Sequence, residues 1–297
     1  MRARRRSRAF YAQLAFTVLV AAFLVVPVVM SITAGLTANF FQGVKSGLTL
    51  RWIGEVWRLY RDTIALSLTI ALACLAVDLV AGVPAAYVLA KARSRWTRLA
   101  EEALVLPIAV PGLATALALI LAYGTWREFR TSWIFILVGH VLFTLPFMVR
   151  AVLAVLSSID LRTLEEGAAS LGASFWQRFT GVVLPNCRGG ILAGSLMVVT
   201  LSVGEFNMTW MLHTPLTKTL PVGLADSYAS MRLEIGSAYT VVFFFMIIPL
   251  LIGIQLAARP RRVRASRDEA SDPEARHGSA GARPSVGGLG AISGPPA

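Results

Sequence analysis

Charged residues are scarce in this chain: aspartate, glutamate, lysine and arginine make up 15% of its 297 residues. An ordinary soluble domain carries about a quarter of its residues as charges. Hydrophobic residues make up 56% of the chain, and long apolar runs occupy six windows: 11–34, 63–90, 103–124, 131–149, 189–212 and 235–258. Formal charge within these windows is limited to Asp78 and Glu205. The composition therefore excludes an ordinary soluble globular domain.

Cysteine and histidine are scarce as well. The chain has two cysteines, Cys74 and Cys187, and three histidines. Two cysteines this far apart form neither a disulfide framework nor a metal-ligand pattern. The sequence also lacks a nucleophile elbow and an H-E-x-x-H motif. We therefore expect no metal site and no catalytic residues, and the chain is not predicted to be an enzyme.

The six apolar windows are each long enough to cross a membrane, because a helix spans the hydrocarbon core in about 20 residues. Backbone groups in lipid must hydrogen-bond within the protein, and the alternation typical of barrel strands is absent. The sequence predicts an all-α integral membrane protein with six transmembrane helices. The first apolar run is longer than that of a signal peptide and has no clear cleavage site, so we expect it to be retained.

Lysine and arginine are distributed unevenly between the two sides of this predicted bundle. With both termini inside, the cytoplasmic segments hold 20 of them and the opposite side holds 8. The positive-inside rule then predicts a multi-pass protein of the bacterial inner membrane with both termini in the cytoplasm. The net charge of +12 is explained by this topology and by anionic membrane lipid, so no nucleic-acid partner is expected.

Three parts of the chain differ in composition. Residues 1–10 are predicted to be a basic cytoplasmic N-terminus, and 11–258 the six-span domain. The tail 259–297 is rich in arginine, serine, glycine and proline and has little apolar content, so it is predicted to be a disordered cytoplasmic segment.

A polar, helix-prone loop, residues 157–188, separates the fourth and fifth predicted spans. Its first half repeats apolar residues at helical spacing: Leu161, Leu164, Ala168 and Leu171. Thr163 and Glu166 have the spacing of a capping box at the start of this helix. Gly172 suits the left-handed position that follows a helix.

The second half of the 157–188 loop predicts another short helix. Ser174 and Gln177 form a second capping-box pattern, and Leu184-Pro185 is predicted to end the helix, because a residue before proline avoids helical angles. The resulting helix-turn-helix has an apolar ridge outside the bilayer. Either it folds back on its own bundle or it docks into a groove of another protein.

The spacing from Glu166-Gly167-Ala168 through Gly172 to Leu184-Pro185 resembles the EAA loop of a known family. This loop marks the permease subunits of binding-protein-dependent ABC importers with the type I, or MetI-like, fold. One departure is Gly167, where the family usually has alanine. The resemblance implies an ATPase-coupling loop that includes Glu165, Glu166, Gly167, Ala168, Leu171, Gly172, Leu184 and Pro185.

The same resemblance implies the partners. In this family the short helix of the loop sits in a cleft of a cytoplasmic ATPase subunit, and ATP-driven closure of two ATPases moves the spans. A second permease subunit, identical or related, and an extracytoplasmic solute-binding protein complete such an importer. The chain itself has no G-x-x-x-x-G-K-[ST] motif, so we expect it to bind no cofactor and the ATPase to use the ATP.

Polar residues inside the predicted spans are candidates for the solute pathway, because a carboxylate in lipid is costly unless it has a partner or lines a cavity. The segment SVGEFNMTWML, which contains Glu205 and Asn207, resembles the GEF segment of sulfate-, iron- and polyamine-type permeases. Asp78 favours a contact between helices, and His140 a hydrogen-bonded core residue. The candidate pathway residues are Glu205, Asn207, Asp78 and His140.

Two other functions remain compatible with the residues. An ion- or proton-coupled secondary transporter would use Asp78 and Glu205 as coupling sites. A membrane anchor or receptor subunit would use the 157–188 loop only for docking. For an importer, likeness to the polyamine, iron and sulfate group makes putrescine or spermidine the first candidate solute, since carboxylates within the spans favour a cation.

The charge distribution generates a topology prediction. Reporters fused after Gly47 and after Leu216 are expected to lie outside the membrane, and those after Ser94 and Ser174 inside, because positive flanking segments stay in the cytoplasm. Alkaline phosphatase activity and fluorescence of a green fluorescent protein fusion distinguish the two sides. Swapped signals at any two positions would contradict the topology.

Overall fold

The computed structural model describes residues 8–92 and 94–257 of the chain, and these residues are almost entirely helical. The predicted tail 259–297 and most of the predicted N-terminal segment 1–10 therefore lie outside the described residues. Within the described ranges the elements are α1 (Arg8–Gly35), η1 (Gly43–Ser46), α2 (Arg51–Lys91), α3 (Arg95–Ala103), α4 (Leu106–Ala109), α5 (Gly112–Tyr123), α6 (Arg127–Thr131), α7 (Trp133–Ser157), α8 (Leu161–Ser170), α9 (Phe175–Arg178), the π-helical turn η2 (Phe179–Val183), α10 (Leu184–Gly204), α11 (Asn207–Leu212), α12 (Leu220–Ala229) and α13 (Leu233–Ala257).

Among the described residues, five helical runs are long and apolar enough to cross a membrane. They are Ala9–Gly35, Arg51–Lys91, Trp133–Ser157, Phe175–Gly204 and Leu233–Leu256. A sixth results if Arg95–Ala109 and Gly112–Tyr123 are counted as one span bent by 101°. The prediction of an all-α integral membrane protein is confirmed, while the number of spans stays a prediction.

The predicted span 103–124 is interrupted, because the chain leaves helical geometry between α4 and α5. Val110 is extended (φ −86°, ψ 130°) and Pro111 follows with φ −55° and ψ 137°. Proline has no backbone N–H to continue the helix, and it disfavours the helical conformation of the residue before it. An apolar window gives no sign of such a break when its average hydropathy stays high.

The second and fourth spans extend beyond their apolar windows. The window 63–90 belongs to α2, which begins at Arg51 and departs from helical angles only at Tyr60 (φ −129°, ψ 16°). Similarly, the window 131–149 belongs to α7, which continues to Ser157. A helix continues past a charged residue such as Arg150 because its backbone hydrogen bonds are already formed, so the apolar window marks only part of the helix.

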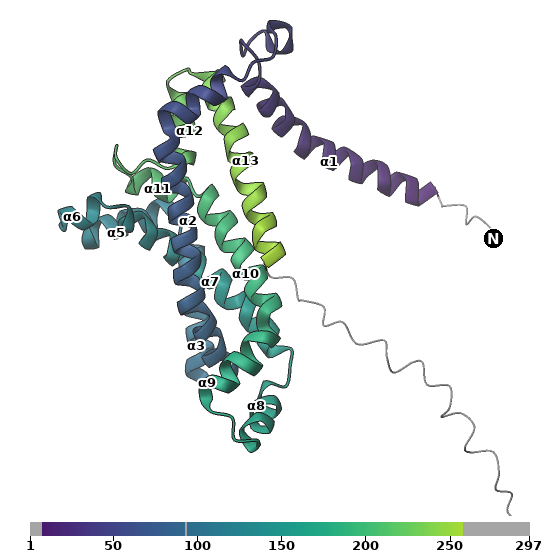
Figure 1. Ribbon diagram of the computed structural model, residues 1–297, viewed down its shortest axis with the longest axis vertical. Coiled ribbons are helices and arrows are strands. Elements are labelled where there is room, and N and C mark those ends of the chain that lie inside the picture. The colour runs from purple at the N-terminus through teal and green to yellow at the C-terminus, as the bar shows by residue number, and fades with distance from the viewer. Residues whose placement is uncertain (1–7, 93, 258–297) are drawn as a thin grey trace, which may run out of the picture. The chain divides into compact units, whose positions relative to one another are not determined.

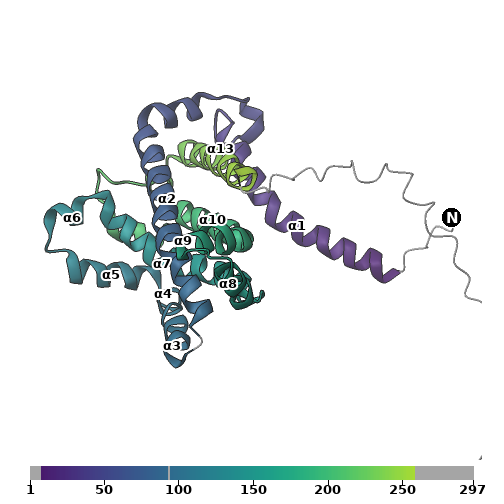
Figure 2. The same cartoon turned by 60° about the horizontal axis from the view of Figure 1, so that its bottom comes forward.

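Helices α2, α7 and α10 pack side by side at the centre of the bundle, and α13 packs against α2 and α10 (Figure 1). Their shared apolar core includes Cys74, Met148, Val152, Cys187 and Val198. In both views α5 and α6 stand to one side of α2 (Figures 1 and 2). Contacts between α5 and α11 connect them to the rest of the bundle.

Small residues allow the central helices to approach closely. A Cβ atom on Gly190 of α10 would lie 2.6 Å from the carbonyl oxygen of Ala151 on α7. One turn further, a Cβ on Gly194 would lie 2.7 Å from the sulfur of Met148. Close backbone packing of this kind is how transmembrane helices associate when lipid removes the hydrophobic driving force.

Candidate functional site

Two interruptions of helices lie against each other in the bundle. The chain leaves helical geometry at Val110-Pro111, and again at Glu205 (φ −70°, ψ 119°) between α10 and α11. A Cβ atom on Gly112 would lie 3.6 Å from the backbone nitrogen of Met208 and 3.7 Å from Oε1 of Glu205. The predicted span 189–212 is therefore interrupted near its end, because α10 ends at Gly204 and α11 begins at Asn207.

The carboxylate of Glu205 compensates for the second interruption. Its Oε1 accepts a hydrogen bond from the backbone nitrogen of Met208 at 2.8 Å, and Oε2 accepts from the backbone nitrogen of Thr209 at 2.8 Å. The hydroxyl of Thr209 donates to Oε2 at 2.7 Å. Three donors thus solvate an intramembrane carboxylate whose side chain is 8% exposed.

His140 on α7 extends this polar group to α10 and α11. Its Nδ1 lies 2.8 Å from the hydroxyl of Ser202 and its Nε2 lies 2.8 Å from the hydroxyl of Thr209. Because Thr209 gives its only hydroxyl proton to Glu205, it accepts from Nε2. In the neutral imidazole, Nδ1 then accepts from Ser202. His140 is the hydrogen-bonded core residue that the sequence favours.

Asp78 on α2 is fully buried and joins α7. The hydroxyl of Thr144 donates to its Oδ2 at 2.6 Å and also lies 2.8 Å from the carbonyl oxygen of His140. The sulfur of Cys74 lies 3.1 Å from the same hydroxyl. The other oxygen, Oδ1, has no hydrogen-bond partner among the residues that the structure describes. Asp78 thus makes the contact between helices that the sequence favours.

Asn207, the fourth candidate pathway residue, differs from the other three. It is exposed at the first position of α11, and a Cβ on Gly112 would lie 3.6 Å from its own Cβ. Glu205, His140 and Asp78 use their polar atoms inside the bundle, whereas Asn207 presents its amide at the interruption. In a membrane, non-helical backbone occurs where protein covers it or where it lines a water-filled cavity.

The 157–188 loop begins differently from its predicted capping box. The side chain of Asp160 accepts from the backbone nitrogen of Thr163 at 3.3 Å and from its hydroxyl at 2.7 Å, so α8 is capped by Asp160. Glu166 instead accepts from Nε of Arg162 at 2.7 Å, and this hydrogen bond raises the pKa of Arg162. The predicted Thr163–Glu166 capping box is wrong because aspartate three residues before Thr163 takes the cap position.

The turn between the two short helices is as predicted. Gly172 has φ +82°, and a Cβ atom there would meet nothing within 4 Å. Ser174 and Gln177 form the second capping box, with Ser174 donating its backbone N–H to Gln177 Oε1 at 2.7 Å. The requirement for glycine at 172 is therefore conformational and not a matter of space.

The predicted helix end at Leu184-Pro185 is wrong. Helix α9 continues through the π-helical turn η2 into α10, so Phe175–Gly204 is one helical run. A π-turn loosens the hydrogen-bond pattern where proline lacks its N–H, and the helix passes Pro185 without ending. The loop is consequently joined to a membrane-spanning helix without a flexible segment.

The outer side of the 157–188 loop is apolar and exposed. Leu171 is 90% exposed and Trp176 is 69% exposed, and Leu164 and Phe175 are also exposed. Gly167 faces open space, since a Cβ atom there would meet nothing within 4 Å. Leu161 and Val183, by contrast, are buried in the core of the bundle. Only part of the loop therefore folds back on its own bundle.

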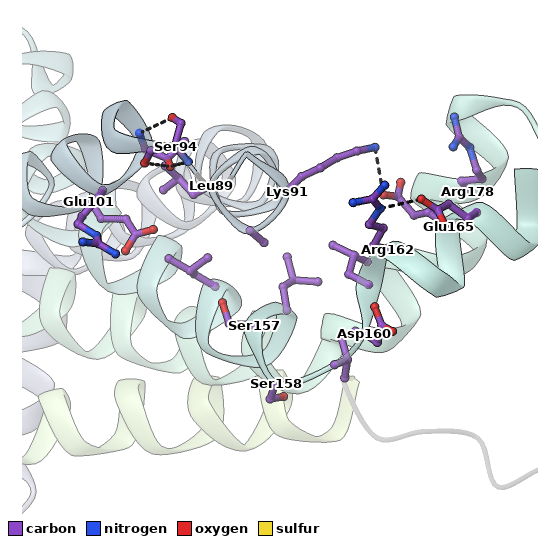
Figure 3. A pocket seen from close by; sticks show the side chains of 18 of the residues that line it. Leu89, Lys91, Ser94, Glu101, Ser157, Ser158, Asp160, Arg162, Glu165 and Arg178 are labelled. Carbon is purple, nitrogen blue, oxygen red and sulfur yellow. Dashed lines mark hydrogen bonds and ion pairs between the residues drawn. The ribbon is translucent and has the colours of Figure 1, made fainter.

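Glu165 does not share the outward direction of Glu166. Its carboxylate is buried and accepts from the hydroxyl of Tyr87 at 2.7 Å, and Nζ of Lys91 lies 3.1 Å from its other oxygen. Glu165 and Lys91 border a cavity of about 1550 Å³ between the ends of α2 and α7 and helices α3 and α8. Figure 3 shows the side chain of Lys91 extending toward α8. Neither Tyr87 nor Lys91 was predicted to belong to this site, although both lie one turn apart at the end of an apolar run.

The arrangement defines a class of protein. Interrupted helices with polar groups inside a helical bundle are typical of membrane transport proteins. Residues 79–265 match the family described as binding-protein-dependent transport system inner membrane component, and the chain belongs to this family. It is therefore a permease subunit of an ABC importer, in which a separate subunit hydrolyses ATP.

Among the described residues, no cluster of three or more His, Cys, Asp or Glu side chains has the arrangement of a metal site.

Related proteins carry transport names. The chain is 29% identical to the sulfate transport system permease protein CysW of Synechocystis over 231 residues, which cover 72% of this chain and 83% of that protein. It is 27% identical to the putative 2-aminoethylphosphonate transport system permease protein PhnV of Salmonella typhimurium, covering 82% and 92%. It is also 27% identical to the putrescine transport system permease protein PotI of Escherichia coli, covering 82% and 89%.

A solved structure has the same fold. A chain in the crystal structure of a bacterial ABC transporter that imports the acidic polysaccharide alginate superposes with a TM-score of 0.66. The match covers 86% of this chain and 96% of that chain, at 16% sequence identity. At this identity the likeness shows the fold alone.

The contact between Asp78 and Thr144 generates a prediction about stability. Thr144→Val keeps the shape of the side chain but leaves the buried carboxyl without its donor, so the protein is expected to lose about 1–3 kcal/mol of stability. Thermal unfolding in detergent measures the loss. Thr69→Val is the matched control, because Thr69 is an exposed threonine on α2 whose hydroxyl bonds only the carbonyl oxygen of Ala65. Equal melting temperatures of the two variants would contradict the role of Thr144.

Proposed function

We propose that the 157–188 loop of this importer permease docks into a cytoplasmic ATPase and that the interrupted helices border the solute path. The observation that carries the first part is the division of the loop into two sides. Leu161 and Glu165 are buried against the bundle, while Leu171 at the end of α8 and Trp176 on α9 are exposed. An amphipathic helix that leaves its apolar residues uncovered is suited to a groove on a partner.

The charges beside this apolar side support the same partner. Glu166 and Arg162 form an exposed ion pair next to it, with side chains 65% and 86% exposed. Exposed pairs of this kind contribute little to stability, so they are free to exchange partners when another protein docks. This end of the bundle is the cytoplasmic one in the topology that lysine and arginine predict.

A complete importer requires further chains. We propose a second permease subunit, identical or related, because two ATPase subunits need two docking loops. A solute-binding protein is proposed to deliver the solute at the opposite side of the membrane. These partners follow from the family, whose name refers to a binding protein.

The proposed solute path passes the interruption between α10 and α11. Asn207 has an exposed side chain there, and Gly112 lies close to it, since a Cβ atom on Gly112 would be 3.6 Å from the Cβ of Asn207. We propose a small charged solute, as in the names of the relatives. Putrescine or a related polyamine is the first candidate, because Asp78 and Glu205 are the acidic groups within the six apolar windows of the sequence.

Docking of the loop is tested at Gly172. A residue with a side chain at φ +82° costs about 1–2 kcal/mol, so Gly172→Val is expected to misorient α8 relative to α9 and to weaken ATPase binding about tenfold. Co-purification with the cognate ATPase, quantified against permease inserted in the membrane, measures this. Gly189→Val is the control, because Gly189 lies in a helix with nothing within 4 Å of a Cβ atom. Normal ATPase binding by both variants would exclude the loop as the docking element.

Transport by the reconstituted complex tests the function and the solute. Proteoliposomes containing the permease, ATPase and binding protein are expected to accumulate labelled putrescine only when ATP is present. Uptake of labelled sulfate and of labelled 2-aminoethylphosphonate is measured in the same way as uptake of putrescine. Uptake of sulfate alone would replace the polyamine proposal, and uptake driven by a proton or sodium gradient without ATP would support a secondary transporter instead.

A further inference from the structure

Three side chains connect the 157–188 loop to the end of α2. The hydroxyl of Tyr87 donates to Oε1 of Glu165 at 2.7 Å, and Nζ of Lys91 donates to the hydroxyl of Tyr87 at 3.0 Å. The same Nζ lies 3.1 Å from Oε2 of Glu165. Each of the three groups therefore contacts both others, and Figure 3 shows the reach of Lys91 from α2 toward α8.

Burial separates Glu165 from its neighbour in sequence. The side chain of Glu165 is 5% exposed, whereas that of Glu166 is 65% exposed. A protein that docks on the outer side of the loop meets Glu166 but does not reach Glu165. The carboxylate of Glu165 is thus occupied within the permease.

The ring of Tyr87 also contacts the second half of the loop. Its centroid lies 5.5 Å from that of Phe179 and 6.3 Å from that of Phe175, both with edge-to-face geometry. Aromatic pairs in this arrangement attract each other. Tyr87 consequently connects α2 with α8 through its hydroxyl and with α9 and η2 through its ring.

Helix α2 continues from this connection into the centre of the bundle. Asp78 lies nine residues before Tyr87 on α2, with Pro84 between them, a distance of about 13 Å along the helix axis. Asp78 contacts Thr144 on α7, and that hydroxyl lies next to the carbonyl of His140. A movement of the loop that is passed to α2 therefore reaches the polar groups beside the interrupted helices.

We propose that Glu165, Tyr87 and Lys91 form a positioning lock that holds the 157–188 loop on α2, so that displacement of the loop by the ATPase moves α2 with it. This proposal rests on the proposed function. Glu165 is a positioning residue in this arrangement and not a contact for the ATPase. Without the lock, the loop still docks and ATP is still hydrolysed, but the movement is transmitted only through α10 and no longer to α2.

The test uses the complete importer in proteoliposomes and compares solute uptake with ATP hydrolysis. Glu165→Gln removes the ion pair with Lys91, and Tyr87→Phe removes the hydroxyl but keeps the ring and its packing. Both variants are expected to bind the ATPase normally and to hydrolyse ATP, while the solute imported per ATP falls about fivefold or more. Glu102→Gln is the matched control, because Glu102 is an exposed carboxylate on α3 that borders the same cavity.

Exchanging the two charges distinguishes a role in coupling the loop to α2 from a role in the stability of the fold. Lys91→Glu and Glu165→Lys are each expected to lower the ratio of uptake to hydrolysis, and the double variant is expected to recover a substantial part of it. Melting temperatures of all variants are measured in parallel. A lower melting temperature with an unchanged ratio would reduce the three residues to a structural contact and overturn the proposal.

The remaining outcomes are also decisive. Loss of ATPase binding in Glu165→Gln, to the degree expected for Gly172→Val, would make Glu165 a docking contact and overturn the lock. Normal uptake per ATP in both Glu165→Gln and Tyr87→Phe would overturn it as well, while leaving the docking function intact. Failure of the wild-type permease to bind an ATPase would instead remove the proposed function, and the lock with it.

Discussion

The carboxylate of Glu205 replaces the helical hydrogen bonds that the backbone loses where α10 ends. Lipid offers no water to the freed N–H groups of Met208 and Thr209, so this side chain is the condition for an interruption at that depth. The hydroxyl of Thr209 and the imidazole of His140 complete its surroundings. In the sequence Glu205 is a charged residue whose transfer into lipid costs free energy. In the structure its carboxylate supplies the hydrogen-bond acceptors that the backbone needs at the interruption.

The two ends of the permease are organised by different physics. Within the spans, glycines such as Gly190 bring helices together and a few polar side chains connect them. In the 157–188 loop, aromatic rings and the ion pair of the buried Glu165 with Lys91 fix one side, and large apolar side chains remain uncovered on the other. Helix α2 carries residues of both regions, Asp78 in the first and Tyr87 in the second, which makes it the structural connection between them.

The sequence predicted those features that depend on local chemistry. Gly172 and the Ser174–Gln177 box follow from the angles and hydrogen bonds of a few neighbouring residues, and the apolar windows follow from the thickness of a membrane. The break after Gly204 was not predicted, because an average hydropathy does not register backbone groups that lack hydrogen-bond partners. The different environments of Glu165 and Glu166 were not predicted either. Adjacent residues of a helix point about 100° apart, so one of the two can be buried, and contacts with Tyr87 and Lys91, which are distant in sequence, decide which one it is.

The π-helical turn η2 fixes the rotational setting of the loop relative to the membrane span. Its wider turn contains one residue more than an α-helical turn would, and one residue corresponds to about 100° of rotation around the helix axis. Phe175 and Phe179 lie on Tyr87 in this setting, and Trp176 points outward. The rotation of α10 about its axis, together with the one extra residue in η2, therefore determines which side of α9 faces outward. The sequence of the loop alone does not determine it.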